Sequence, residues 1–417
     1  MMTPPAHPAY ERIAIGPDFI KDPFPLLRRL REAGPVHQVV FGKDFAPCRW
    51  LVTRYADVKA GFGDPRLSNQ ILTPLREERD VDALPLTTRA MRRADALLGR
   101  AMANVDPPDH TRLRALVVRA FSAKRMDALR PRVEQLTDEL LDAVAGRAAF
   151  DVVASVAFPV PIQVLCELLG VPPEDGKVFR AAARVLSGFL PDDAAALECI
   201  RSLDAFEDYI RALIVERRAR PSDDLLSDLI RVQEGEHRLS EEELVAMAAL
   251  MIFAGHETTL QVIANGMLAL LTNPDQLATL RASPDLLPNA VEEILRFDGP
   301  ANPGLHRYVL ADVEIGGVTI PAGSYVMLGT ASANRDPAVF ESPDSFDVTR
   351  RFHAPPLAFG FGLHYCMGAR LAKIEGEVVI GALLRRFPDL RLAAEPQGLQ
   401  WRPGFLRGLV ELPVSIR

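Results

Sequence analysis

A single long helical pattern in the second half of the sequence limits the architectures open to this chain. Ser240 and Glu243 have the spacing of a capping box, and they predict a helix that continues to Asn273-Pro274. At 1.5 Å per residue such a helix is about 50 Å long, enough to cross a whole globular molecule. Its first half, LVAMAALMIFAG, is apolar on every side, so we expect the helix to be buried.

A short polar stretch, Ala254-Gly255-His256-Glu257-Thr258-Thr259, interrupts this apolar helix. Glycine, charged and β-branched residues at consecutive positions all lower helix propensity, so the stretch is unfavourable where it stands. Such local violations are expected at functional sites. The alternative is a polar stripe that faces another helix, and we prefer the functional interpretation.

A glycine-rich segment, residues 359–368, contains one cysteine, Cys366. Three glycines in ten residues exclude a helix or strand interior and predict a loop. Strong helix formers follow from Ala369, so Cys366 is predicted at a helix N-terminus, where its pKa would fall below about 8.5. Taken alone, Cys366 could be a nucleophile, a redox thiol, a metal ligand or an inert buried cysteine.

Composition excludes several classes of protein. The net charge of -7 gives no support for nucleic-acid binding. The N-terminal sequence does not have the pattern of a signal peptide, and the longest apolar run, Leu244 to Gly255, is shorter than the roughly 18 residues that span a membrane. Four cysteines in 417 residues are too few for a disulfide framework and fit a reducing cytosol.

The remaining pattern is mainly helical with a few short strands. The Gly316-Gly317 pair predicts a tight hairpin over Asp312 to Ile320, and Trp401 to Ile416 is predicted as a second hairpin. Residues 67–102 are predicted as a long loop with partial helix. Further helices are predicted at 22–33, 55–62, 108–126, 131–144, 161–169, 174–190 and 194–218, and strands at 36–41 and 50–53.

Three other groups of charged residues have two possible interpretations each. His110 and Arg114 are four apart and share one helical face, which by default is a solvated face. Arg307 lies just before the first hairpin, where a solvated strand edge is the default. Glu293 and Arg296 lie opposite the apolar stripe of their helix, so pattern alone predicts a surface pair worth a few tenths of a kcal/mol.

The cysteine loop resembles the haem-binding signature of the cytochrome P450 monooxygenases, Phe-Gly-x-Gly-x-(His or Arg)-x-Cys-x-Gly. Its fixed positions are matched by Phe359, Gly360, Gly362, His364, Cys366 and Gly368. The resemblance implies that Cys366 is the thiolate ligand of the haem iron, which favours O–O cleavage. It also implies that the glycines let backbone amides approach the sulfur and the porphyrin, and that His364 points at a propionate.

The polar stretch in the long helix matches the family's oxygen-activation motif at every position. The resemblance implies that Gly255 leaves room for dioxygen and that Thr258 bonds to the carbonyl of Ala254 or to a water in a kinked helix. Glu257 and Thr258 would then organise proton delivery.

The same resemblance gives roles to the other charged groups. His110, Arg114 and Arg307 would bind haem propionates. Glu293 and Arg296 would form a buried structural pair, in which the loss of one partner costs about 3–5 kcal/mol. Ser345 stands where many relatives have the arginine that completes this network, and Arg350 or Arg351 would have to replace it.

The family overrides the two or three domains that length alone suggests. We expect one mainly α domain over residues 1–417 with a small β region, and haem b between the long helix and the Cys366 loop. The implied reaction is insertion of one oxygen atom from O₂ into a small apolar organic substrate, often in bacterial secondary metabolism. Electrons would come from a ferredoxin and an NAD(P)H-dependent reductase, and the chain would be a cytoplasmic monomer.

Several alternatives remain at this point. A haem-thiolate isomerase or peroxide-using enzyme would not need the Glu257-Thr258 pair, and a non-catalytic haem sensor would have no reason for it. A haem-thiolate enzyme for C–C or C–O coupling is also open. Candidate substrate-lining residues are residues 67–102, Glu174 to Leu190 including Phe189, Ala254, Ala301 to Leu305, and Phe405.

Electron delivery is predicted to involve a basic patch on the cysteine side. Its six cations are carried by the helix of His110 and by the helix after Cys366: Arg112, Arg119, Lys124, Arg125, Arg370 and Lys373. Scattered solvated charges are the alternative. A patch of this kind would attract a small acidic iron–sulfur protein, and salt would screen the attraction.

Overall fold

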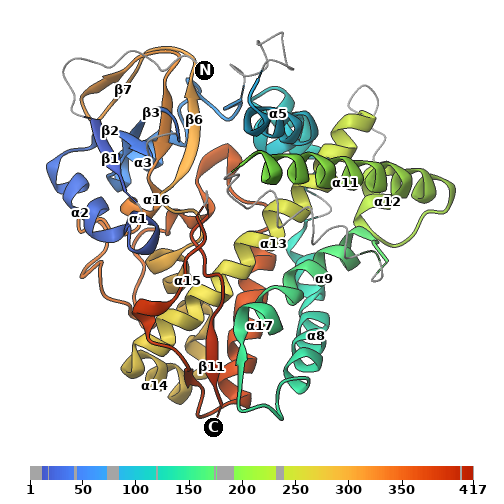
Figure 1. Cartoon of the computed structure of the whole chain (residues 1–417), viewed down its shortest axis with the longest axis vertical. Coiled ribbons are helices and arrows are strands. Elements are labelled where there is room, and N and C mark those ends of the chain that lie inside the picture. Colours follow the sequence, from blue (N-terminus) through green and yellow to red (C-terminus); the bar gives the residue numbers. More distant parts are fainter. Residues whose placement is uncertain are drawn as a thin grey trace.

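The computed structural model describes residues 12–16, 18–41, 45–72, 84–118, 121–172, 175, 192–231, 239–403 and 406–416. Its helices are α1 (Asp18–Lys21), α2 (Phe24–Ala33), α3 (Tyr55–Gly61), α5 (Leu86–Leu98), α6 (Asp109–Val117), α7 (Ala123–Ala128), α8 (Arg130–Asp142), α9 (Pro159–Leu169), α11 (Asp193–Ala219), α12 (Leu225–Arg231), α13 (Glu241–Thr272), α14 (Pro274–Ala282), α15 (Leu287–Asp298), α16 (Thr330–Ala333) and α17 (Ala369–Arg386). Helices therefore dominate the described part of the chain, as expected (Figure 1).

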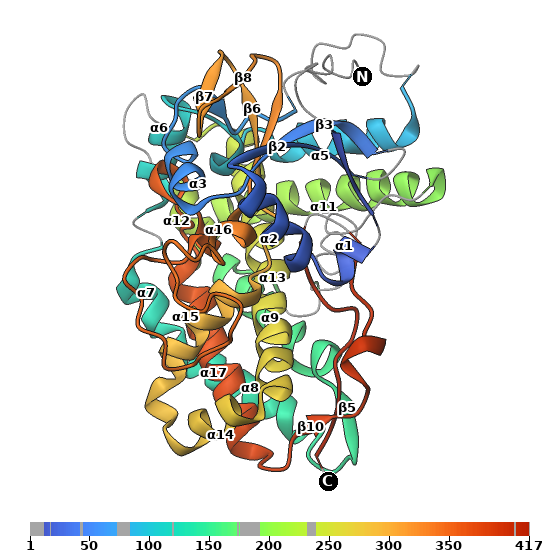
Figure 2. The same cartoon turned by 90° about the vertical axis from the view of Figure 1, so that its left-hand side faces the viewer.

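Strands form a smaller β region beside the helices (Figures 1 and 2). The strands are β1 (Arg12–Ile15), β2 (Val36–Phe41), β3 (Phe45–Val52), β4 (Leu67–Ser68), β5 (Ala149–Asp151), β6 (Leu305–Val309), β7 (Val313–Ile315), β8 (Val318–Ile320), β9 (Tyr325–Leu328), β10 (Arg391–Leu392) and β11 (Pro413–Ser415). One sheet has the order β1-β2-β3-β9-β6-β4, another has the order β10-β11-β5, and β7 pairs with β8. The parallel pairing of β3 with β9 joins the N-terminal strands to the chain that leads to the cysteine loop.

Helix α13 is the central element, and it confirms the predicted capping box. The Ser240 hydroxyl accepts from the Glu243 amide, and the Glu243 carboxylate accepts from the Ser240 amide. The helix packs against α9, α15 and α17, and most of its side chains are buried (Figure 2). It is long and apolar enough to cross a membrane, but the core helix of a globular protein passes the same test.

Most of the predicted elements are present, with shifted boundaries. Gly316 and Gly317 have φ values of 57° and 78° and form the turn between β7 and β8, as predicted. Residues 67–102 contain the strand β4 and the 13-residue helix α5. The helix predicted over 108–126 is two helices, because the chain is extended at Ser122, where α7 begins. The helix predicted over 174–190 lies outside the described residues, apart from residue 175.

The C-terminal hairpin is shorter than predicted. Trp401 pairs with Leu409, and the Arg402 amide donates to the Gly408 carbonyl at 2.8 Å. Beyond this point the chain leaves the hairpin, and β11 pairs with β5 and β10 instead.

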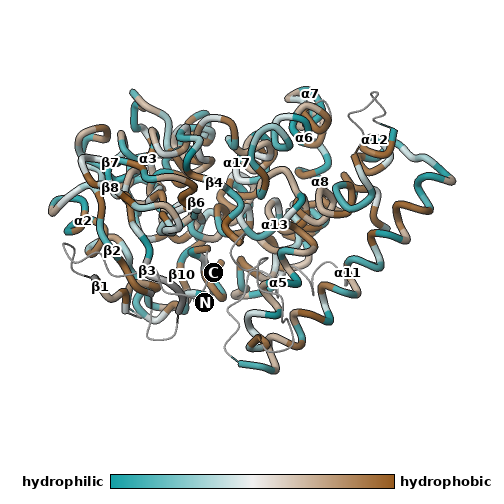
Figure 3. Tube along the Cα trace, turned by 90° about the horizontal axis from the view of Figure 1, so that it is seen from above, coloured by the Kyte–Doolittle hydropathy of each residue, from teal (hydrophilic) through white to brown (hydrophobic). Residues whose placement is uncertain are grey.

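The hydrophobic pattern of α11 alternates along its length, as Figure 3 shows, because one face packs on the core while the other is exposed.

Two arginines attach the N-terminal helices to α15. The Arg335 guanidinium lies 3.5 Å from the ring centroid of Phe24 and 4.0 Å from that of Phe297. The Arg407 guanidinium donates to Asp298 Oδ1 at 2.7 Å and to the carbonyl of Ile20 at 2.8 Å. Stacked and hydrogen-bonded guanidinium groups therefore join α1 and α2 to the helical core.

Candidate active site

The cysteine loop is held in a conformation that requires glycine. Gly360 and Gly362 have φ values of 71° and 73°, in the left-handed region that side-chain-bearing residues rarely adopt. The loop closes where the Cys366 amide donates to the Phe359 carbonyl at 3.0 Å. Helix α17 begins at Ala369, so Cys366 lies just before a helix N-terminus, as predicted.

The Cys366 thiol is accessible to solvent on one side and crowded by protein atoms on the others. This partial burial raises the pKa of Cys366, although the backbone amides of Gly368 and Ala369 donate to the sulfur and the positive charge of Arg114 opposes the shift. The prediction of a lowered pKa is therefore wrong for the protein alone, because the desolvation of the thiolate outweighs the helix terminus. The amides that approach the sulfur are present as expected.

Four side chains from three separate segments converge beside this loop. The imidazoles of His110 (α6) and His364 lie with centroids 3.9 Å apart, and the Arg114 guanidinium donates to the Tyr365 carbonyl at 3.0 Å. Arg307 in β6 is buried, and burial lowers its pKa to about 10. Burial, then the neighbouring His110, Arg307 and Arg114, lower the pKa of His364 to about 3. The structure thus brings all four predicted propionate ligands together.

This cluster fits a group that carries carboxylates. Both ring nitrogens of His110 are buried and make no hydrogen bond within the described part of the chain. Buried donors without acceptors are costly, and a propionate would supply the acceptors. Together with the Cys366 thiol, this donor set suits haem b: a sulfur for iron, and two arginines and two imidazoles to bind two propionates.

Two residues in the middle of α13 are accessible to solvent. Ala254 is exposed within a helix that is otherwise mostly buried, and Thr258, one turn further along, is partly exposed. The Thr258 hydroxyl donates to the Ala254 carbonyl at 2.5 Å, which confirms the predicted hydrogen bond. Thr259 makes the equivalent bond to Gly255 at 2.8 Å. One face of the predicted motif is therefore available to a ligand.

Gly255 also has a role in helix packing. A Cβ atom at Gly255 would lie 2.9 Å from Leu165 Cδ1 in α9, closer than real Cβ contacts. The absence of a side chain lets α13 pack on α9, and room for dioxygen at Gly255 stays a prediction.

Glu257 is buried and forms an ion pair that was not predicted from the sequence. Its Oε1 atom accepts from Arg402 Nη1 at 2.7 Å, and Arg402 belongs to the C-terminal hairpin. His256, its neighbour, lies edge-on to Phe158, and burial lowers the pKa of His256 to about 4, so this imidazole is neutral near pH 7. Sequence pattern does not predict the Glu257–Arg402 pair, because the two residues are 145 positions apart in the chain.

Glu293 and Arg296 in α15 form a fully buried pair, as the family resemblance implied and the helical pattern did not. Two parallel bonds of 2.7 and 2.8 Å join them, and Arg350 Nε donates to Glu293 Oε2 at 2.9 Å. Arg350, not Arg351, therefore completes the network. Ser345 contributes its carbonyl, which accepts from both arginines at 3.0 and 2.9 Å.

The structure describes only some of the candidate substrate-lining residues. Ala254 is exposed, whereas Asn302 and Gly304 are buried and the rest of Ala301 to Leu305 is half-buried. Phe189 and Phe405 lie outside the described residues.

A glycine-rich cysteine loop, a cluster of propionate-type donors and a polar break in a buried helix define a haem-thiolate protein. A family model described as "Cytochrome P450" matches residues 189–390. The chain is 45% identical to cytochrome P450 107B1 of Saccharopolyspora erythraea, over 96% of this chain and 97% of that protein. It is 43% identical to the vitamin D(3) 25-hydroxylase of Pseudonocardia autotrophica, over 95% and 94%. The chain belongs to the cytochrome P450 family.

Solved structures give the same result for the fold. The bacillaene polyketide synthase cytochrome P450 PksS of Bacillus subtilis superposes with a TM-score of 0.85 at 36% identity, covering 96% of this chain and 98% of that one. The mainly α fold, the haem cofactor and the monooxygenase class are thus established by family membership.

Proposed function

We propose that Glu257 and Thr258 deliver the protons of a monooxygenase reaction whose balance is RH + O₂ + 2e⁻ + 2H⁺ → ROH + H₂O. The observation that supports this role is the exposed face of α13, where Thr258 and Ala254 open from an otherwise buried helix. The Thr258 hydroxyl is anchored on the Ala254 carbonyl and can pass a proton by rotation. Glu257, which immediately precedes Thr258 in the sequence, is the proposed acid.

In this proposal His110, Arg114, Arg307 and His364 hold the propionates, and Cys366 binds the iron. Haem supplies the activation of dioxygen when it is bound. Residues 1–417 act as one domain and the chain acts as a cytoplasmic monomer.

The proposed substrate is a small apolar organic molecule, and secondary metabolism is the proposed setting. Two relatives support this: one is named for vitamin D(3), an apolar molecule, and another belongs to a polyketide synthase system. A panel containing vitamin D3, long-chain fatty acids and macrolactones, screened by the shift of the ferric haem spectrum, tests the substrate class.

Replacement of Thr258 by alanine tests the proton relay. Thr258→Ala should bind haem and substrate like the wild type, because the substitution removes only the hydroxyl and methyl groups of one partly exposed side chain. We expect product formed per NADPH consumed to fall about tenfold or more, with O₂ + 2e⁻ + 2H⁺ → H₂O₂ taking the electrons. The matched control is Thr259→Ala, since Thr259 makes the same backbone bond at a buried position. An unchanged ratio for Thr258→Ala excludes Thr258 from the relay.

The basic patch predicted for the electron donor is largely neutralised by internal ion pairs. Arg112 bonds to Glu243, Arg125 to Asp228, Arg370 to Asp127 and Lys373 to Glu292. Lys124 is exposed, and Arg119 lies outside the described residues. Four of the six cations therefore hold helices together, and a docking role for them has lost its support.

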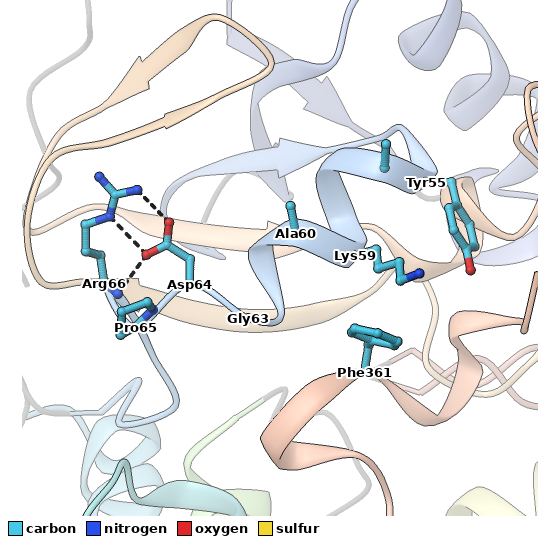
Figure 4. Close-up of a pocket in the computed structure, with 9 residues that line it drawn as sticks. Tyr55, Lys59, Ala60, Gly63, Asp64, Pro65, Arg66 and Phe361 are labelled. Atoms are coloured by element: carbon cyan, nitrogen blue, oxygen red, sulfur yellow. Dashed lines mark hydrogen bonds and ion pairs between the residues drawn. The ribbon is translucent and has the colours of Figure 1, made fainter.

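A groove beside the cysteine loop is a better candidate for the donor. Figure 4 shows Lys59 of α3 over the ring of Phe361, at 4.7 Å from the centroid. Phe361 is exposed and lies five residues before Cys366. An apolar residue under a lysine suits a small acidic ferredoxin, whose acidic groups would be attracted to Lys59. A ferredoxin reduced by an NAD(P)H-dependent reductase is the proposed donor.

Charge reversal at Lys59 tests this docking surface. Lys59→Glu should slow ferredoxin reduction of the haem by roughly 3- to 10-fold at low salt, and the difference should shrink as salt screens the charge. Arg370→Gln is the control, because Arg370 is also accessible but is already paired with Asp127 at 2.7 Å. Stopped-flow rates across a salt series decide. If only Arg370→Gln slows reduction, the donor docks elsewhere.

A further inference from the structure

Asp106, just before α6, fastens the end of β4 to the start of this helix. The Ser68 hydroxyl and the Asn69 amide both donate to the Asp106 carboxylate, the amide at 3.0 Å. The Asp106 carbonyl accepts from the His110 amide at 3.0 Å. The Ser68 hydroxyl also accepts from the Gln70 amide at 2.9 Å, so its orientation is fixed from both sides. Asp106 therefore holds β4 with its side chain and α6 with its backbone.

Strand β4 connects this contact to Arg307. Ser68 is opposite Tyr308 in the antiparallel pairing of β4 with β6, and Arg307 is the neighbour of Tyr308 in β6. Arg307 is buried, so the position of its strand decides where its guanidinium lies. Asp106 thus links the two segments that carry His110 and Arg307, which are far apart in the sequence.

The negative charge of Asp106 also reaches these two side chains. Burial lowers the pKa of Arg307 to about 10, and the charge of Asp106 opposes this shift. Burial, and then the charge of Arg114, lower the pKa of His110, and Asp106 again opposes the shift. A carboxylate close to a buried cation offsets part of the cost of burying that cation. Asp106 therefore stabilises the cluster electrostatically as well as by its hydrogen bonds.

We propose that Asp106 is a positioning residue for haem: its carboxylate, held by Ser68, keeps α6 against the β4–β6 pair so that His110 and Arg307 stay together. The proposal rests on the proposed role of His110 and Arg307 as propionate ligands. Asp106 does not touch the haem in this role. It acts through the two donors, because it fixes the segments that carry them and reduces the net positive charge around them.

Two substitutions separate the contact from the charge. Ser68→Ala removes one donor to Asp106 and leaves the carboxylate charged. We expect it to release haem to excess apomyoglobin about three- to tenfold faster than the wild type, because α6 is held less firmly. It should leave the reduction potential of the haem unchanged.

Asp106→Asn keeps the size of the side chain and removes its charge. Loss of a negative charge near the site should favour the reduced haem, so we expect the equilibrium constant for one-electron reduction to rise about threefold. Spectroelectrochemical titration of the holoenzyme measures this constant. Neither this titration nor the transfer of haem requires a substrate or a donor protein.

Asp109→Asn is the matched control. Asp109 lies in the same helix as His110, but its side chain is 65% exposed and pairs with Arg112 at 3.5 Å. It should keep the wild-type rate of haem transfer and the wild-type reduction equilibrium. Far-ultraviolet circular dichroism of the three variants should match that of the wild type, so that a global loss of structure does not explain faster transfer.

The outcomes distinguish this proposal from the one on which it rests. The role of Asp106 is overturned if Ser68→Ala loses haem at the wild-type rate, if Asp106→Asn leaves the reduction equilibrium unchanged, or if Asp109→Asn shifts it equally. Arg307→Gln tests the propionate site itself and should speed haem transfer at least as much as Ser68→Ala. If Arg307→Gln has no effect, the proposed propionate site fails. If Arg307→Gln speeds transfer and Ser68→Ala does not, only the role of Asp106 fails.

Discussion

Cys366→His should produce a protein whose reduced carbon monoxide complex lacks the long-wavelength Soret band of thiolate-ligated haem. The sulfur of Cys366 is accessible, and two backbone amides donate to it. It is therefore suited to bind iron as a thiolate. Imidazole would replace a charged sulfur by a neutral nitrogen, and the electron density given to iron would fall. We expect monooxygenation to be lost, with a drop of at least about 10³-fold.

The control for this substitution is Cys199→Ala, because Cys199 is buried in α11, away from the loop. It should keep both the band and the activity. Absorption spectra of the two reduced carbon monoxide complexes are sufficient to decide. Survival of the band in Cys366→His would show that another residue ligates the iron.

Glu293→Gln should have the largest effect on stability. The substitution removes the negative charge between Arg296 and Arg350 and leaves two guanidinium groups buried without their carboxylate. Breaking a buried pair in this way costs about 3–5 kcal/mol. Since Arg296 and Arg350 also bind the backbone of residues 341–345, we expect a loss of haem content along with a lower free energy of unfolding.

The adjacent residue provides a matched control. Glu292 pairs with Lys373, but its side chain is 31% exposed. Glu292→Gln should therefore cost about 1 kcal/mol or less. Urea unfolding followed by circular dichroism gives both values. Equal losses for Glu292→Gln and Glu293→Gln would mean that burial of the Glu293 pair does not matter.

The pair at Glu293 also shows where helical pattern is insufficient. The stripe of Val291, Ile294 and Leu295 correctly marks one buried face of α15, but it says nothing of what covers the other face. Residues 334–350 cover it, and these are distant in the sequence. The choice between Arg350 and Arg351 was open for the same reason: Arg350 is buried and Arg351 is exposed, and only the path of the loop decides this.

Local signals gave the better predictions. The capping box at Ser240, the glycine turn of β7 and β8 and the loop around Cys366 were all predictable, because each depends on residues within a few positions. The Arg402 partner of Glu257 depends on how the C-terminal hairpin folds back on α13. The availability of a cation to a partner protein likewise depends on its ion pairs within the fold. Arg370 and Lys373 were predicted as part of a docking surface, but Arg370 pairs with Asp127 and Lys373 pairs with Glu292.

The stacking of Arg335 between α2 and α15 makes this contact insensitive to acidity. Burial lowers the pKa of Arg335 to about 10, yet this value is far above neutral pH, so the group keeps its charge where histidines and carboxylates titrate. Lysine could not replace it, because stacking between Phe24 and Phe297 requires a flat cation. The contact between α2 and α15 at Arg335 therefore keeps its positive charge from acidic to mildly alkaline pH, and a change of pH in this range does not release it.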